Sequence, residues 1–335
     1  MEYAPIPALS LQASRIALGT WSISGWMWGG TDERDALNTI AAALDSGINI
    51  IDTAPAYGWG RSEQLIGRVL AERGGRDHVI VATKLGLRPS DGQPVRNSSP
   101  ESIRQEIEDS LRRLQTDYID IYQVHWPDPN VPFEQTAATL EELRKQGKIR
   151  AIGVSNFSPE QMDRFRLSAP LHTVQPPFNL FERDAERAVL PYARRNGLAV
   201  LAYGPLCRGL LAGRMSANTR FSGDDVRLLD PKFQPPRYAR YLEAVSQLDR
   251  LARERFGKRV IHLAVRWVLD QPGVTVALWG ARKPEQLEPI AEATGWKLDE
   301  AALAEIDRIV ANAVTQPVGP EFMAPPASVA SQTSS

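Results

Sequence analysis

The feature that most constrains the fold of this chain is an alternation of short apolar runs with amphipathic segments along most of its 335 residues. The short runs are apolar on both faces, which is typical of strands buried in a parallel sheet. Eight such strands are expected, at residues 16–19, 48–51, 79–82, 118–122, 149–154, 171–174, 198–201 and 274–278.

The segments between these runs show helical spacing. Ile103, Ile107 and Leu111 recur on one face of a helix that Ser99 is expected to cap, with Pro100 at its first position. Eight strands, most of them separated by one helix, predict an α/β fold of the (β/α)8, or TIM barrel, type. The alternative is a doubly wound open sheet, although its usual G-x-G-x-x-G is absent after the first strand.

Two regions depart from this alternation. Residues 1–14 are expected to form a hairpin that caps the base of the barrel, and residues 206–238 form a long loop after the seventh strand. A structured loop of this length often serves as a lid over a binding site. The chain is therefore predicted to be a single barrel domain over residues 1–324, followed by a small, polar and disordered tail at residues 325–335.

The charge of the chain is balanced, with 39 Lys and Arg residues against 40 Asp and Glu residues. This balance excludes binding of nucleic acid or of an anionic membrane through overall basicity. No apolar run reaches the ~18 residues of a membrane span, and the single cysteine, Cys207, cannot form an intramolecular disulfide. The four histidines show no metal-binding spacing. We expect a cytoplasmic protein, and a monomer, without a metal, nucleic acid or membrane partner.

The chemistry of a TIM barrel lies at the carboxyl ends of its strands. The second predicted strand ends in Asp52 and its loop carries Tyr57, while the third ends in Lys84 and the fourth in His125. A lysine ammonium beside a tyrosine stabilises the phenolate and lowers a pKa that is otherwise about 10. Tyr57 would then be a usable acid, with Asp52 as the counter-charge of Lys84. This set predicts the protonation of a developing alkoxide.

Each of these residues also has a structural interpretation. Asp52 and Lys84 could form a structural ion pair, and His125 could be a buried histidine with its hydrogen bonds satisfied; their joint placement favours the catalytic interpretation. A second chemical hypothesis is a Schiff-base aldolase that uses Lys84. The neighbouring Asp52 argues against it, because a carboxylate keeps the amine protonated and therefore not nucleophilic.

The same residues carry a family resemblance. Residues 52–58 (DTAPAYG), followed by Ser62-Glu63 and Gly67, resemble the signature of the aldo-keto reductases. Further matches follow in the family's order, at residues 82–84 (ATK), 123–126 (QVHW), 153–157 (GVSNF) and 280–282 (GAR). The resemblance covers most of the chain, and the segments at 277–284 and 317–326 are most similar to the general-stress members of this family in bacilli.

The resemblance implies a catalytic tetrad in which Tyr57 donates a proton, Lys84 and Asp52 tune it, and His125 helps to place the carbonyl. It also implies that NADPH lies extended across the rim of the barrel. The residues implied to bind this cofactor are Thr20, Trp21, Asp52, Ser155, Asn156, Gln175, Tyr203, Gly204, Pro205, Leu206, Cys207, Arg208, Arg214, Arg227, Gly280, Arg282 and Gln286.

Within this set the resemblance assigns different parts of the cofactor. Ser155, Asn156 and Gln175 would hold the nicotinamide amide, and Tyr203 would stack on its ring. The loop at residues 204–208 would follow the pyrophosphate, together with Arg214 and Arg227.

Arg282 is expected to start the helix after the eighth strand. A guanidinium at a helix N-terminus suits a 2′-phosphate and favours NADP over NAD. The Glu-Asn pair that many relatives carry near the adenine is absent, because Gln286 is followed by Pro289 and Ile290. Cys207 is expected to be a buried filler rather than a redox-sensitive thiol.

The function predicted on this basis is NADPH-dependent reduction of a small-molecule aldehyde or ketone, with Tyr57 as the proton donor. The alternative is a non-catalytic sensor or regulatory subunit that binds NADPH. The aromatic residues Trp26, Trp28, Trp59 and Trp126 are expected to border an apolar substrate pocket.

Overall fold

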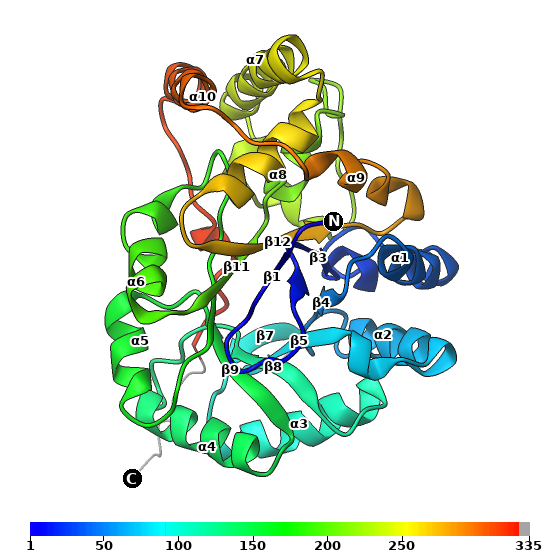
Figure 1. Ribbon diagram of the computed structural model, residues 1–335, viewed down its shortest axis with the longest axis vertical. Helices are drawn as coiled ribbons and strands as arrows, with labels where there is room; N and C mark the ends of the chain where they lie inside the picture. Colours follow the sequence, from blue (N-terminus) through cyan, green and yellow to red (C-terminus); the bar gives the residue numbers. More distant parts are fainter. Residues whose placement is uncertain (91, 328–335) are drawn as a thin grey trace.

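The computed structural model describes residues 1–90 and 92–327. At its centre is a closed barrel of parallel strands, surrounded by helices (Figure 1). In barrel order the strands are β3 (Ile16–Gly19), β4 (Ile50–Asp52), β5 (Ile80–Leu85), β8 (Ile119–Val124), β9 (Ile149–Ser155), β10 (Thr173–Gln175), β11 (Ala199–Tyr203) and β12 (Val274–Gly280).

All eight predicted strands are confirmed, with shifts of a few residues at their ends. Every residue of β5 and β8 is buried, as expected for strands that face the core on one side and helices on the other. The barrel closes where β12 pairs with β3, with Gly280 opposite Gly19. The doubly wound alternative is therefore wrong, because an open sheet would leave two strands with unpaired edges.

The helices follow the strands as the spacing predicted. Ser99 caps α3, accepting a hydrogen bond from the backbone N–H of Ser102, and Pro100 is the first helical residue. Gly67 lets α2 approach α3, because a Cβ at this position would lie 2.3 Å from the carbonyl oxygen of Arg113. The helices are α1 (Glu33–Asp45), α2 (Arg61–Arg73), α3 (Pro100–Leu114), α4 (Phe133–Lys145), α5 (Pro159–Arg166), α6 (Val189–Asn196), α7 (Arg237–Phe256), α8 (Val260–Asp270), α9 (Ile290–Ala293) and α10 (Glu300–Ala313).

The amino-terminal segment forms the predicted cap. The short strands β1 (Tyr3–Ala4) and β2 (Ala13–Ser14) pair antiparallel. The turn between them carries Ile6, which is 1% exposed and packs in one cluster with inward-facing residues of the barrel strands. The hairpin therefore fills one end of the barrel, and the site must lie at the other end.

A second hairpin follows β5 and was not predicted. Its strands β6 (Leu87–Ser90) and β7 (Gln93–Arg96) each contain a proline, and the two prolines lie opposite one another. In the sequence, a proline argues against a strand because it cannot donate a backbone hydrogen bond. Both strands are nevertheless tolerated, because they pair mainly with each other in a two-stranded ribbon; the further bridge found among the described residues joins Arg96 to Ala327.

The long loop after β11 is built from 3-10 turns at Cys207–Ala212, Val226–Leu228 and Pro231–Phe233. The carboxyl-terminal segment then crosses the rim of the barrel. Its Pro325 carbonyl accepts a hydrogen bond from Arg96 Nε at 2.8 Å, so the first residue of the predicted tail is in contact with the hairpin of β6 and β7. The remaining tail residues, 328–335, lie outside the described residues.

None of the helices in the described ranges is long and apolar enough to cross a membrane. The same part of the chain holds no group of three or more His, Cys, Asp or Glu side chains that could bind a metal ion.

Candidate active site

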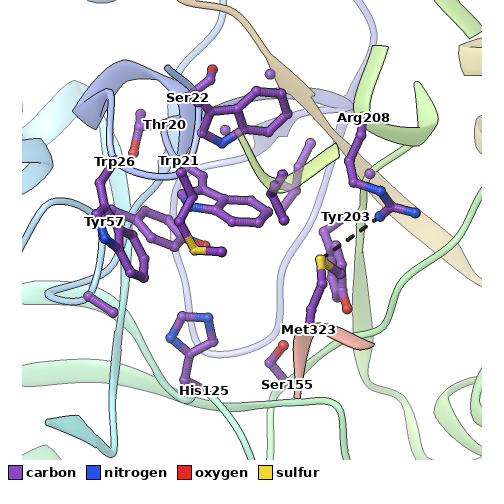
Figure 2. A pocket seen from close by; sticks show the side chains of 18 of the residues that line it. Thr20, Trp21, Ser22, Trp26, Tyr57, His125, Ser155, Tyr203, Arg208 and Met323 are labelled. Atoms are coloured by element: carbon purple, nitrogen blue, oxygen red, sulfur yellow. Dashed lines mark hydrogen bonds between the residues drawn. The ribbon is translucent and has the colours of Figure 1, made fainter. Parts of the chain in front are cut away.

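A cavity of about 440 Å³ opens at the carboxyl ends of the barrel strands. Side chains from several loops converge on it, with Trp21 and Tyr57 facing His125 and Ser155 across the opening (Figure 2). Three of the four ionisable residues predicted at the strand ends, Asp52, Tyr57 and His125, line this cavity, and Lys84 lies behind them, bonded to Asp52 and Tyr57. The four predicted residues are therefore close together in the structure.

Lys84 is the centre of this group. It lies on β5, is 1% exposed, and donates to Asp52 Oδ2 at 2.6 Å, to the Thr53 carbonyl at 2.8 Å and to Tyr57 OH at 3.2 Å. His125, which follows β8, packs edge-on against Tyr57 with ring centroids 5.8 Å apart. An ammonium has three N–H donors, and all three are used here. Such a lysine has no lone pair to attack a carbonyl, which argues against the aldolase hypothesis.

Asp52 is fixed from both sides. One carboxylate oxygen accepts from Lys84, and the other accepts from the side-chain amide of Gln175 at 2.7 Å. Its backbone carbonyl accepts from the hydroxyl of Thr20 at 2.9 Å. Ser62 in turn donates to Thr20 and accepts from Thr53. This network holds the end of β4, and hence the Lys84 ammonium, in one orientation.

The pKa values in this group differ from the sequence expectation in one respect. Burial, with a smaller effect of the Asp52 charge, raises the pKa of Tyr57 well above its usual value. The expected lowering of the Tyr57 pKa by Lys84 is therefore not found in this structure, because the phenol is buried and the charge of Asp52 adds to the effect of burial. Tyr57 consequently keeps its proton at neutral pH, which is the form that a proton donor needs.

The two basic groups are also shifted by burial. Burial lowers the pKa of Lys84, although the neighbouring Asp52 opposes this effect. Burial and the charge of Lys84 lower the pKa of His125 well below its usual value, so its imidazole is neutral. A neutral imidazole can donate a hydrogen bond to a substrate oxygen without adding a second positive charge.

Next to this group the structure brings together the amide residues predicted to hold a nicotinamide. Asn156 receives a hydrogen bond from Tyr203 OH at 2.9 Å and donates to Ser155 Oγ at 3.1 Å. Ser155 Oγ donates to the backbone carbonyl of Gln175 at 2.9 Å. All four side chains line the cavity, as do the predicted residues Thr20, Trp21, Gly204, Pro205, Leu206 and Gly280.

The far end of the cavity carries Arg227 and Arg282. Arg282 donates to the Trp28 carbonyl at 2.7 Å, whereas Arg227 pairs with Asp225 and lies over the ring of Trp28. The predicted helix start at Arg282 is wrong: a 3-10 turn at Pro284–Leu287 follows instead. The side-chain oxygen of Gln286, which lines the cavity, accepts the backbone N–H groups of Arg282 and Lys283.

Three predicted cofactor residues lie elsewhere or are already bonded. Arg214 is exposed and does not line the cavity. Cys207 is fully buried behind the loop, and burial raises the pKa of its thiol to about 12, as expected for an inert filler. Arg208 does line the cavity, but it is paired with the buried carboxylates of Glu182 and Asp230.

The sequence missed part of the cavity wall. Leu87, Gln93 and Pro94, all from the unpredicted hairpin, line the cavity opposite the loop after β11. Only the recognition of this hairpin could have identified them, and its prolines concealed it.

The residues present fit a nicotinamide dinucleotide. Amide and hydroxyl side chains of Ser155, Asn156 and Gln175 gather beside the tetrad and suit a carboxamide, while the guanidinium groups of Arg227 and Arg282 at the far end suit phosphate.

Comparison with known proteins agrees with this geometry. Residues 15–311 match the model of the aldo/keto reductase family. The chain is 60% identical to the aldo-keto reductase YhdN of Bacillus subtilis over 97% of its own length and 98% of that protein. It is 35% identical to the NADH-specific methylglyoxal reductase of Escherichia coli, over 90% and 96% of the two chains.

A solved structure is similar as well. The glycerol dehydrogenase AKR11B4 from Gluconobacter oxydans superposes with a TM-score of 0.87 at 52% identity, covering 96% of this chain and 99% of that one. The predicted resemblance is thus confirmed over nearly the whole length. The chain belongs to the aldo/keto reductase family, oxidoreductases that act on carbonyl compounds with a nicotinamide cofactor.

Proposed function

We propose that this protein reduces aldehydes or ketones to alcohols with NADPH, and that Tyr57 donates the proton. The observation that carries the proposal is the contact of 3.2 Å between Lys84 Nζ and Tyr57 OH, at the base of a cavity whose wall carries the amides of Asn156 and Gln175. In this proposal the proton donor and the cofactor therefore share one opening.

The tetrad residues have distinct tasks in this proposal. A nicotinamide cofactor held by Ser155, Asn156 and Gln175 would supply the hydride that the carbonyl carbon receives. Tyr57 OH gives its proton to the carbonyl oxygen, on which negative charge develops. The phenolate that remains is stabilised by the ammonium of Lys84, which Asp52 holds in place. His125, being neutral, donates a hydrogen bond that orients the carbonyl oxygen.

The test of this assignment is the Tyr57→Phe variant, which keeps the ring and removes the proton. We expect kcat for NADPH-dependent reduction of benzaldehyde or methylglyoxal to fall by about 10²–10⁴, measured as the loss of NADPH absorbance. Tyr3→Phe is the matched control, because Tyr3 is exposed at the capped end of the barrel. Equal activity of wild type and Tyr57→Phe would contradict the assignment.

The preference for NADPH is supported by Arg282. Its guanidinium bonds a main-chain carbonyl rather than a carboxylate, so among the described residues no close ion pair neutralises it. We expect Arg282→Ala to raise the KM for NADPH about tenfold, the worth of one charge-assisted contact, and to leave the KM for NADH unchanged. Arg195→Ala, an exposed residue of α6, is the control. An NADH preference in the wild type, as the Escherichia coli relative's name states for that protein, would overturn this part.

A non-catalytic sensor remains the other outcome of the same assays. Tight NADPH binding without turnover of any carbonyl compound, by a protein that is fully folded, would establish that role instead.

We also propose that the enzyme works as a monomer in the cytoplasm. The one cysteine, Cys207, is a buried free thiol, which suits a reducing compartment. Light scattering of the purified protein tests the monomer, and a mass of twice the chain would contradict it.

A further inference from the structure

Four charged side chains that the tetrad does not use are buried together beside the cavity. They are Glu182, Arg208, Asp230 and Lys232, with exposures of 5%, 7%, 0% and 0%. We call them the four-charge cluster. Burying even one ion pair is costly, so a set of four in one place calls for an explanation beyond stability.

The cluster is closely bonded internally. Arg208 Nε lies 2.5 Å from Asp230 Oδ2, and the same guanidinium pairs with Glu182. Lys232 Nζ lies 2.8 Å from Glu182 Oε1 and 3.5 Å from Asp230 Oδ1. Two positive charges therefore meet two negative charges, and the set is neutral as a whole.

The carboxylate of Glu182 remains ionised. Burial alone would raise the pKa of Glu182, but the charges of Arg208 and Lys232 outweigh burial and hold it below its usual value. The cluster thus behaves as a set of fixed charges whose mutual attraction resists separation.

The four members of the cluster come from three different segments of the rim. Glu182 lies in the loop after β10, where Asn179 donates both to its carboxylate and to the Gly204 carbonyl. Arg208 lies in the loop after β11, which lines the cavity. Asp230 and Lys232 belong to the last turn of the long loop. Three segments are therefore tied together at one point.

The cluster also holds a fourth segment, the carboxyl-terminal one. Lys232 Nζ donates to the Gly319 carbonyl at 3.3 Å. The ring of Phe322 lies over Arg208 and Lys232, at 5.4 and 6.0 Å from the two cations. Met323 lies against Arg208 at 4.0 Å, as Figure 2 shows beside Tyr203. Residues Phe322 to Pro326 all line the cavity, so the cluster anchors one of its walls.

We propose that the four-charge cluster is a positioning device for substrate: it fixes residues 319–326 as a wall of the carbonyl-binding pocket and keeps that wall in register with the loop after β11. Asp230 and Lys232 are then positioning residues. Neither of them lines the cavity, so they act through Phe322 and Arg208. The role in substrate binding rests on the proposed function, whereas the anchoring of the segment does not.

Hydrogen exchange of the cofactor-free protein tests the anchoring without any turnover. In Lys232→Met, which keeps the stem and removes the charged contacts, we expect the backbone amides of this segment that carry a hydrogen, Gly319 and residues 321–324, to exchange about tenfold faster than in wild type, since they lose one charged anchor. Strands β5 and β8 should exchange as before. Lys145→Met is the matched control, because Lys145 is exposed on α4 and makes one surface ion pair.

A double-mutant cycle tests the effect on substrate. Phe322→Ala and Lys232→Met should each raise the KM for benzaldehyde about tenfold and change kcat less than threefold. The double variant should be little worse than either single one, because both changes release the same wall. A residue that serves only overall stability would lower the melting temperature without this shared effect on KM.

Lys232→Met leaves the cluster with an unbalanced negative charge, so a second variant guards against misfolding. Lys232→Met combined with Asp230→Asn restores neutrality and should show the same faster exchange and raised KM. Unchanged exchange at 319–326 and unchanged KM in both variants would overturn the inference. If the variants exchange faster but the wild-type protein turns over no carbonyl compound, the anchoring of the segment stands and only the proposed function is contradicted.

Discussion

The Asp52–Lys84 pair and the four-charge cluster both bury opposite charges at the rim of the barrel, but they face different neighbours. Lys84 spends one of its three N–H donors on Tyr57, whose ring lines the cavity. The cations of the cluster donate their N–H groups to carboxylates and to the carbonyl of Gly319. The difference suggests that buried charge serves proton transfer only where a donor is left for a titratable group at the cavity.

The largest effect that would test this comparison comes from making the same change in both places. Lys84→Met should lower kcat/KM by about 10³, because the Tyr57 phenolate loses its stabilising charge, whereas Lys232→Met should alter mainly KM. Both variants should lose about 3–5 kcal/mol of unfolding free energy: Lys84→Met leaves Asp52 without its ion-pair partner, and Lys232→Met leaves Glu182 and Asp230 sharing Arg208. Steady-state kinetics and urea unfolding measure the two quantities. Comparable losses of kcat in both variants would remove the distinction.

The next effect concerns charge balance within the cluster. Asp230→Asn alone should cost about 3 kcal/mol or more, because it leaves Arg208 and Lys232 sharing one carboxylate. Adding Lys232→Met should cost less than the sum of the two single changes. Urea unfolding of the three variants checks this prediction, and strict additivity would mean that the cluster members act independently.

A smaller, pH-dependent effect is expected from Glu106, a buried carboxyl without an ion-pair partner among the described residues. Its oxygens accept from the Gly86 N–H and from Ser102 Oγ. Burial nonetheless raises its pKa to about 8. The folded protein therefore keeps a proton that the unfolded chain loses above its usual pKa of 4.5. Stability should fall as pH rises between these values, by at most about 1.4 kcal/mol per unit.

Glu106→Gln should remove this pH dependence. The free energy of unfolding of the variant should therefore increase relative to that of the wild type as the pH rises from about 5 to about 8. Urea unfolding across that range measures the gain. Glu285→Gln, at an exposed position, is the control: its unfolding free energy should show the same pH dependence as that of the wild type. A constant difference between Glu106→Gln and wild type would show that Glu106 is ionised throughout.

The smallest effect is expected at Cys207, which lies against Arg208 within the cluster. Because it is fully buried and its thiol pKa is raised to about 12, the native protein should not react with iodoacetamide at neutral pH. Mass spectrometry should find one adduct only after unfolding in urea. Rapid labelling of the native protein would mean that the cluster opens readily.

Much of the fold could be predicted because the barrel strands carry a strong local signal. Runs such as Ile80–Leu85 are buried on both faces, and such a segment is stable only as a strand in the interior of the fold. The hairpin after β5 carried the opposite signal, because Pro89 and Pro94 argue against strands. Its existence depends on contacts with residues distant in sequence, such as the bond between the Arg96 N–H and the Pro326 carbonyl.

The tetrad could be located from the sequence for the same reason: each member follows a predictable strand. The four-charge cluster could not, because Glu182, Asp230 and Lys232 lie in loops, where charged residues are normally solvated. Arg208 was consequently assigned to the pyrophosphate alone. Likewise, the sequence shows that Lys84 is near Tyr57 but not how deeply the phenol is buried, and burial is what raises the pKa of Tyr57.

The pairing of β12 with β3 has a consequence for how this chain is made. Strand β3, at residues 16–19, acquires its second neighbour only when residues 274–280 are available. During synthesis from the amino terminus, β3 therefore keeps one unpaired edge until most of the polypeptide has left the ribosome. An incomplete barrel exposes apolar strand surface, so a nascent chain of this family should depend on chaperones until its last strand emerges.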